Sequence, residues 1–449
     1  MSIWTIVVLV IMLGILVTVH ELGHFFIARL LGIKVFEVSI FVGPALVTWR
    51  KNDVEYSIRC IPFGAYVRFT DIDEKGEPIE DDNDPKLLVN NSRIKRLLVA
   101  LAGPFMNLVL GVVLALVSAC IFGFYTTRVY EPFESTQLAM ASSQFEEGDE
   151  VVRIDGRRVY TYLDIQFELD GSYSSAEDML IEFRSSRTGE LYEANLVPVI
   201  TERPMLGIVH SADTDNNYNG WHISEVLEQH NGGDPILQIG DYLTAVDGIS
   251  VTDENFEEHF ASLTEGNTMH LEFYRNGEFM EADCIKTMIR SSNDRGVDVM
   301  GEAVNSFDSF VDALEFSVKL PLTVLNITVR SIEEAFAGEV EAYNVVSGPV
   351  GVADSVSTVV DNVDTSTTVK VYNILFLTTV LSLGLVITNM LPIPGLDGVQ
   401  VILLLIEMVI GRKLSKKAEL IINGIGFVLL IGLVIFALVS DVIRIIVGG

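Results

Sequence analysis

The segment HELGH places two histidines and a glutamate at the end of the first long apolar stretch of the chain. On a helix, His20 and His24 lie on one face because they are four residues apart, so both imidazoles can reach one Zn²⁺. Glu21 would lie beside them and could act as a base toward a water molecule. The other histidines all fall between residues 210 and 270, outside the apolar stretches. The pattern predicts a site for one zinc ion per chain.

A polar cap on the end of an apolar helix is the alternative interpretation of HELGH. Ionisable side chains at membrane depth cost several kcal/mol unless they have partners, and they usually serve a function. We therefore favour the zinc site over the cap. A catalytic zinc site needs a third protein ligand and an open position for water.

Asp397 is the best candidate for the third ligand. It is the first acidic residue after the third apolar stretch, in TNMLPIPGLDG, and it follows Pro392, Pro394 and Gly395. Irregular backbone at membrane depth is tolerated only where it is buried in protein or lines a wet cavity. An ordinary turn between two helices is the alternative, and the HELGH partner favours the cavity wall.

The composition indicates how these residues are positioned. Hydrophobic residues make up 49% of the 449 residues and the mean hydropathy is +0.40, both typical of a membrane protein. The sequence therefore predicts a polytopic α-helical membrane protein with four transmembrane helices, each near the roughly 20 residues that a span needs. We do not expect the first span to be a cleaved signal peptide, because no basic segment precedes it. The apolar stretches lie near residues 3–28, 97–124, 374–391 and 421–440.

Charge is distributed unevenly along the chain. The formal net charge is −31, and residues 125–374 hold 14 Lys and Arg against 45 Asp and Glu. This acidity argues against nucleic acid and anionic lipid as partners of that block. Basic residues instead gather between spans one and two and between spans three and four, so we expect these loops in the cytoplasm and the acidic block and both termini outside. His20, His24 and Asp397 would then share a depth near the cytoplasmic side.

The acidic block contains an internal repeat. EGDEVVRIDGRRV (147–159) and IGDYLTAVDGISV (239–251) align without gaps, which matches Gly148 with Gly240 and Asp149 with Asp241. Each copy predicts a strand that ends in an Asp-Gly turn. Such dipeptides are common turn signals, but two aligned copies favour two related small domains.

The remaining segments complete the predicted organisation. Residues 35–69 alternate between apolar and polar residues and predict short strands, whereas the segment from residue 303 is amphipathic and predicts helices at the outer membrane interface. The predicted parts are a first span with HELGH at 1–34, a membrane-associated β-hairpin region and loop at 35–96, a second span at 97–124, two α+β domains at 126–203 and 204–292, interfacial helices at 303–373, a third span at 374–397, a cytoplasmic segment at 398–420 and a fourth span at 421–449.

Four motifs and their order along the chain resemble the site-2 protease family of intramembrane zinc metalloproteases. The resemblance covers nearly the whole chain. The repeats look like tandem circularly permuted PDZ domains. The other motifs are HExxH in the first span, AGPxxN in the second (Ala102, Gly103, Pro104, Asn107), and NxxPxPxLDG from Asn389 to Gly398. Val399 after LDG and Ala65 in GAYV depart from the family pattern at positions where glycine is common.

The resemblance implies a role for each matching residue. His20, His24 and Asp397 would be the zinc ligands and Glu21 the catalytic base. The hairpin of residues 35–69 would bind the substrate as an added strand. Further implied residues are Asn389, Pro392, Pro394, Gly64 and Tyr66 at the substrate, and the PDZ motif residues Gly148, Asp149, Gly240 and Asp241.

The implied function is cleavage of transmembrane segments of single-span membrane proteins, such as an anti-sigma factor, in regulated intramembrane proteolysis at a bacterial inner membrane. The PDZ domains would bind extended or C-terminal peptides and control substrate access. A membrane-anchored PDZ receptor with a structural metal is the alternative, and Glu21 argues against it because a structural site needs no base. A metal transporter would need polar residues in several spans, whereas here they gather at one depth.

Overall fold

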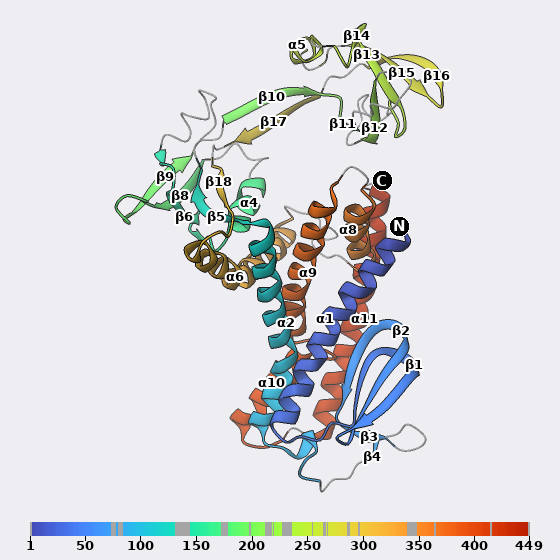
Figure 1. The fold of residues 1–449 in the computed structure, drawn as a ribbon, viewed down its shortest axis with the longest axis vertical. Coiled ribbons are helices and arrows are strands. Elements are labelled where there is room, and N and C mark those ends of the chain that lie inside the picture. Colours follow the sequence, from blue (N-terminus) through green and yellow to red (C-terminus); the bar gives the residue numbers. More distant parts are fainter. Residues whose placement is uncertain are drawn as a thin grey trace. The chain divides into compact units, whose positions relative to one another are not determined.

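Among the residues that the computed structural model describes, four helices are long and apolar enough to cross a membrane, as predicted (Figure 1). They are α1 (Ile3–Leu30), α2 (Arg93–Phe122), α9 (Thr367–Asn389) and the part Gly424–Ile443 of α11 (Lys416–Val447). The structure describes residues 2–72, 78–79, 84–130, 144–171, 178–196, 199–211, 218, 220–226, 236–253, 255–263, 266, 268–284, 288–294, 297–338, 348–362, 365–413 and 415–447.

The chain divides into two units, which are described separately. The first comprises residues 1–127, 159–167 and 299–449 and contains the four apolar helices. The second comprises residues 128–158 and 168–298 and contains most of the β-structure of the acidic block. The predicted combination of membrane helices with separate β-structure is therefore confirmed.

Serine residues begin several of the long helices. The side chain of Ser2 accepts a hydrogen bond from the Thr5 amide (3.2 Å), and Ser366 accepts one from the Val369 amide (3.4 Å). Each bond satisfies an amide that has no partner within the helix. Ser306 forms a capping box with Ser309 at the start of α6 (Phe307–Ala337).

Helix α2 is the centre of the first unit, where it packs against α1, α6, α9 and α10 (Asp397–Ile410). Two glycines allow the closest approaches. A Cβ at Gly23 of α1 would overlap the Ala102 carbonyl of α2, and a Cβ at Gly111 would lie 2.5 Å from Leu383 of α9. Small residues at these contacts bring the helix backbones together, which is how membrane helices pack without a hydrophobic driving force.

Two long strands, β1 (Glu37–Lys51) and β2 (Val54–Arg68), follow α1, where the sequence predicted several short ones. Residues 37–40 pair with residues 65–68 on one side and with 55–58 on the other, and the register shifts around Gly43. The pairing thus places residues 65–68 at one edge of a curled sheet. The chain continues through β3 (Asp71–Ile72), β4 (Pro78–Ile79) and a 3₁₀ turn at Leu88–Asn90.

A buried carboxylate holds this sheet together. Glu37 is 3% exposed and accepts hydrogen bonds from Ser57 (2.9 Å), Arg59 (2.6 Å), Tyr66 (2.9 Å) and Arg68 (3.3 Å), which lie on both flanking segments. Burial alone would raise the pKa of Glu37, but the bonds from Arg59, Tyr66 and Ser57 hold it below its usual value. The edge segment 65–68 is therefore fixed to the rest of the sheet by ionic hydrogen bonds.

The segment after residue 303 forms helices, as the amphipathic pattern indicated. Helix α6 runs through Pro321; it buries Ala313 and Leu320 and exposes apolar residues such as Leu314 and Val318 on another side. Helix α8 (Pro349–Asp361) begins where Asp441 of α11 accepts hydrogen bonds from the amides of Gly348 (2.9 Å) and Val350 (3.0 Å). The carboxylate caps the N-terminus of α8 and links α11 to that helix.

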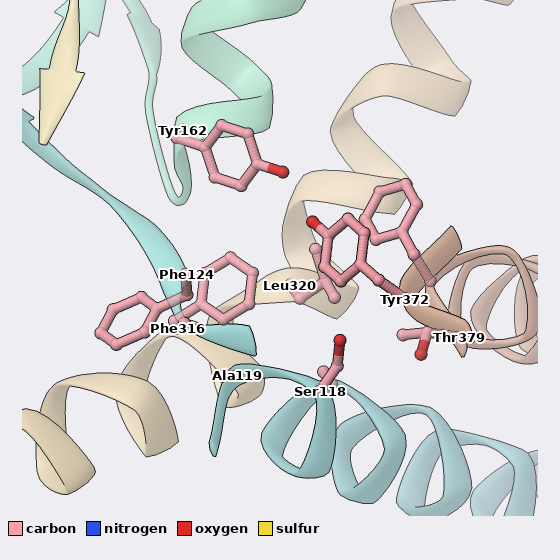
Figure 2. Close-up of a pocket in the computed structure, with 11 residues that line it drawn as sticks. Ser118, Ala119, Phe124, Tyr162, Phe316, Leu320, Tyr372 and Thr379 are labelled. Atoms are coloured by element: carbon pink, nitrogen blue, oxygen red, sulfur yellow. The ribbon is translucent and has the colours of Figure 1, made fainter. Parts of the chain in front are cut away.

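A small aromatic cavity lies where α2, α6, α9 and the start of α4 (Tyr162–Gly171) meet (Figure 2). Tyr162 and Tyr372 turn their hydroxyls toward each other across it. Burial, followed by the neighbouring Tyr372, raises the pKa of Tyr162, so this phenol stays protonated. Next to the cavity, buried Asp164 accepts hydrogen bonds from Thr323 (2.6 Å) and Asn326 (2.8 Å) of α6. These contacts hold the start of α4 on α6.

Two of the described sheets have six strands each and share the arrangement of five of them, but the sixth, an edge strand, follows the other five in the chain in the first sheet and precedes them in the second. The first is β18-β5-β6-β8-β9 with β7 beside β6, and the second is β11-β12-β13-β15-β16 with β14 beside β13. The first sheet has β18 (Val299–Glu302), β5 (Phe124–Val129), β6 (Glu150–Ile154), β7 (Arg157–Arg158), β8 (Met179–Arg184) and β9 (Leu191–Leu196). The second has β11 (Ile208–Ser211), β12 (Trp221–Val226), β13 (Tyr242–Val246), β14 (Ile249–Ser250), β15 (Met269–Arg275) and β16 (Glu278–Cys284).

The aligned repeat segments occupy equivalent places, β6–β7 in one sheet and β13–β14 in the other. Asp155 (φ 47°) and Asp247 (φ 53°), each followed by a glycine with positive φ, form the expected turns. The helix α5 (Phe256–Ala261) matches α4 in sequence order. The strands β10 (Val199–Met205) and β17 (Met288–Asp294) pair as a ribbon, and the first sheet is completed by β18 after the second.

We predict that Glu37→Gln loosens the hairpin. The substitution removes the charge that the two arginines face, at a cost of about 1–3 kcal/mol. Because the folded-state pKa of Glu37 lies below its ordinary value of 4.5, its stabilisation is present above that value and is lost as the pH falls through the folded-state pKa. Hydrogen exchange of residues 54–68 should show faster opening in the variant and a weaker acid dependence. Asp53→Asn, at an exposed turn acid, is the control; equal protection in all three proteins would contradict the prediction.

Candidate metal centre

The three predicted ligands meet at one point. His20 and His24 lie on the last turns of α1, and Asp397 is the first residue of α10. Asp397 Oδ2 lies 3.0 Å from His20 Nε2 and 3.4 Å from His24 Nε2, and the two Nε2 atoms are 3.2 Å apart. Residues far apart in the sequence thus present three donor atoms to one small space.

This donor set fits a zinc ion. A tetrahedral zinc with ligand bonds of about 2.0–2.1 Å separates neighbouring donors by about 3.3–3.4 Å, close to the observed distances. Both histidines are 8% exposed. Asp397 Oδ2 is also buried and accepts no hydrogen bond of normal geometry from the described residues. An uncompensated carboxylate oxygen between two imidazoles is costly, and a cation would satisfy it.

Helix α2 supplies the space and the orientation for the imidazoles. His24 Nδ1 lies 2.7 Å from the Val99 carbonyl, so its N–H donates there and leaves Nε2 with a free lone pair. A Cβ at Gly103 would lie 2.6 Å from His20 Nε2 and would overlap His24 Nε2. The sequence does not predict this role for Gly103, which is only part of the motif AGPxxN. The spacing of four residues between Gly103 and Asn107, which puts both on one face of α2, was the available signal of this role.

A tight loop carries Asp397 to the histidines. Helix α9 ends at Asn389, and the loop that follows contains exposed Pro392 and buried Pro394. A Cβ at Gly398 would lie 2.5 Å from the Leu391 carbonyl, and a Cβ at Gly426 of α11 would overlap the Pro394 ring. Two glycines therefore let the loop fold against the end of α9 and let α11 support it from the other side.

Glu21 lies between the ligand set and the sheet edge. Its ligand atom is within 4.8 Å of those of His20 and His24. Its Oε2 accepts a hydrogen bond from the Val67 amide (3.0 Å), which belongs to the edge segment 65–68. A single carboxylate thus contacts the strand that is predicted to receive the substrate and lies beside the predicted metal ligands.

The other predicted site residues have different surroundings. In β2, Gly64 has a φ of 75°, and the Tyr66 hydroxyl donates to Glu37. Asp149 accepts hydrogen bonds from the Glu146 and Ser186 amides and from Tyr192, and Asp241 accepts two from Arg275 (2.9 and 2.7 Å). Both aspartates, like the adjoining Gly148 and Gly240, lie at turns within their own domains, and their carboxylates hold local structure.

Comparison with known proteins places the chain in a family. The model of peptidase family M50 matches residues 8–433. The chain is similar to the regulator of sigma E protease of Haemophilus influenzae, with 25% identity over 470 residues that cover 98% of this chain and 99% of the relative. The Escherichia coli protein of that name is 26% identical over 465 residues, with the same coverage.

Other comparisons add less detail. The chain is also similar to a protein of Clostridium acetobutylicum that is named as a zinc metalloprotease. The two are 24% identical over 446 residues, which cover 99% of this chain and 98% of that protein. Among solved structures, an aminopeptidase N family protein of Idiomarina loihiensis matches with a TM-score of 0.18 and 17% identity over 25% of this chain and 17% of that chain, too little to bear on the fold.

The family match contains HELGH and LDG, the two segments whose side chains converge in the structure. The family is zinc-dependent, and the donor set fits zinc. The resemblance noted in the motifs is confirmed: the chain belongs to peptidase family M50 and is a membrane-embedded zinc metalloprotease.

Proposed function

We propose that this protease hydrolyses a peptide bond within or beside the transmembrane segment of a single-span membrane protein. The observation that carries the proposal is the convergence of His20, His24 and Asp397 at the ends of apolar helices. A substrate segment that is cut at this site must reach the ends of the apolar helices of the first unit. These three residues would hold the zinc ion.

Glu21 is the proposed base. When bound, zinc lowers the pKa of a water molecule and polarises the scissile carbonyl. Glu21 takes a proton from the attacking water and delivers it to the amide nitrogen of the leaving group. Its position beside the histidines and next to the sheet edge suits both transfers.

The edge segment 65–68 is the proposed platform for the substrate. A helical substrate hides its carbonyls in internal hydrogen bonds, so it must unwind before cleavage. Pairing with an edge strand replaces the lost backbone bonds. The Val67 amide already points away from the sheet, toward Glu21, and Ala65 faces the same way because amides alternate along a strand. Gly64 precedes this pairing site and Tyr66 lies within it. Asn389, at the end of α9, and Pro392 and Pro394, in the loop that follows, would position the substrate.

The charge distribution supports an orientation in a bacterial inner membrane, with the metal site near the cytoplasm and the termini and acidic block outside. A polar cavity of about 260 Å³ beside Asp397, lined in part by Arg96, Gln400 and Glu407, would supply water to the site. The exposed apolar side of α6 would contact the outer membrane interface.

The two repeated sheets are the proposed PDZ domains. The arrangement that β5 to β9 share with β12 to β16 and the aligned Asp-Gly turns support this assignment. The domains would bind extended or C-terminal peptides and control access. The names of the relatives favour a regulatory substrate such as an anti-sigma factor, cut in regulated intramembrane proteolysis during a stress response.

Glu21→Gln should abolish cleavage of a reconstituted single-span substrate and leave the zinc content unchanged, because only the base is lost. The measurement is turnover in proteoliposomes together with metal analysis. A chelator should stop the wild-type enzyme, and added zinc should restore it. Undiminished turnover by the variant would refute Glu21 as the base.

Asp397→Asn should lower zinc occupancy, since an amide oxygen is a far weaker ligand than a carboxylate. We expect at least a tenfold loss of zinc affinity, the range seen when a metal site is disturbed. Glu407→Gln, at another buried acid of α10, is the control. A stoichiometric zinc content in Asp397→Asn at limiting zinc would remove Asp397 from the ligand set.

Strand addition predicts a period of two in cross-linking. In a Glu21→Gln background without native cysteines, Ala65→Cys should form disulfides with cysteines at alternate positions of an uncut substrate. Thr48→Cys, on the exposed segment at the other side of the sheet, is the matched control and should give none. Cross-links spaced by three and four residues would show that the substrate remains helical at this edge.

A further inference from the structure

Asn107 of α2 lies beside the metal centre and has an unsatisfied side-chain atom. The residue is fully buried, and its Nδ2 lies 3.4 Å from His20 Nδ1. Its Oδ1 is buried and has no hydrogen-bond partner among the described residues. Its backbone carbonyl accepts a hydrogen bond from Ser382 of α9 (2.8 Å), which holds this turn of α2 in place. A buried amide oxygen without a donor is unfavourable and calls for an explanation.

The tautomer of His20 explains the unpartnered Oδ1 of Asn107. His20 points Nε2 toward Asp397 and His24, so Nε2 must carry the lone pair if it is to bind a metal. The proton then resides on Nδ1, which needs an acceptor. His24 has such an acceptor in the Val99 carbonyl. For His20, the group at the corresponding place is the amide of Asn107.

The end of the Asn107 amide that faces His20 decides which ring nitrogen of His20 carries the proton. With Nδ2 toward Nδ1, the imidazole must accept there and carry its proton on Nε2, where it blocks metal binding. Turning the amide by 180° exchanges two ends of equal shape. It then gives Oδ1 a donor and His20 an acceptor. One rotation thus pairs Asn107 Oδ1 with the His20 Nδ1 proton.

We infer that Asn107 is a positioning residue that accepts a hydrogen bond from His20 Nδ1 and so holds His20 in the tautomer that binds zinc. The inference rests on the proposed ligand set. It also explains why Gly103 and Asn107 are four residues apart: one face of α2 gives the Nε2 atoms room at Gly103 and supports a ring from behind at Asn107.

The test measures zinc affinity without substrate. The full chain is purified in detergent, stripped of metal, and titrated with zinc against a chromophoric chelator; Co²⁺ absorption reports the ligand geometry. Asn107→Leu, of similar size and without an acceptor, should weaken zinc binding by about 10–100-fold and alter the Co²⁺ spectrum. Asn107→Asp, which can only accept, should bind zinc at least as tightly as the wild type. Thr379→Val, which removes a buried hydroxyl from α9, is the control and should change neither.

Each outcome bears on the inference. Wild-type affinity in Asn107→Leu, or equal losses in the leucine and aspartate variants, would overturn it. Should the leucine variant not fold, the aspartate variant decides alone, because a donating role for Asn107 requires the aspartate to weaken binding. His20→Ala tests the ligand set separately. If it loses zinc while Asn107→Leu does not, only the role of Asn107 fails, and if it keeps zinc, the ligand set itself is wrong.

Discussion

The convergence of three predicted ligand atoms inside an apolar helix bundle is the interaction on which the rest of this structure depends. His20, His24 and Asp397 bring a carboxylate oxygen and two imidazole nitrogens within 3.4 Å of one another. In low dielectric such a set is unfavourable unless a cation binds or protons are shared. The bundle must therefore deliver the ligands accurately, and its packing serves that end.

Glycines allow most of these close contacts, because each one lacks a side chain at a place where a neighbouring backbone or ring approaches its own backbone. Gly23 lets α1 approach α2, and Gly103 leaves room for both Nε2 atoms. Gly398 and Gly426 let the loop that carries Asp397 fold between α9 and α11. The polar partners then set the ring orientation, with the Val99 carbonyl behind His24. Close packing and hydrogen bonding thus act on the same few atoms.

The sequence predicts the parts of this arrangement that are local. Residue spacing puts His20 and His24 on one face, hydropathy predicts the four apolar helices, and each Asp-Gly pair predicts a tight turn. Asp397 was identified from its position after a broken helix. The roles of Gly103 and Glu37 were not predicted, because each depends on a contact with a segment that is distant in the sequence or on strand register. The return of β18 to the first sheet was missed for the same reason: nothing in a four-residue strand indicates its partner.

The contact between Glu21 and Val67 connects the metal centre to the sheet. A carboxylate that accepts from an edge amide occupies a position where an added strand would pair, so the proposed strand addition would couple substrate binding to the orientation of Glu21. An added strand could replace the hydrogen bond between Val67 and Glu21 only if the edge segment stays in place when that bond is broken. Glu37 provides that support, since its buried carboxylate accepts hydrogen bonds from Tyr66 and Arg68, the two sequence neighbours of Val67. The hairpin is therefore fixed by one buried glutamate and contacts a second glutamate, the proposed base. Its edge would then be a rigid surface on which an unwound segment could be aligned with the candidate metal centre.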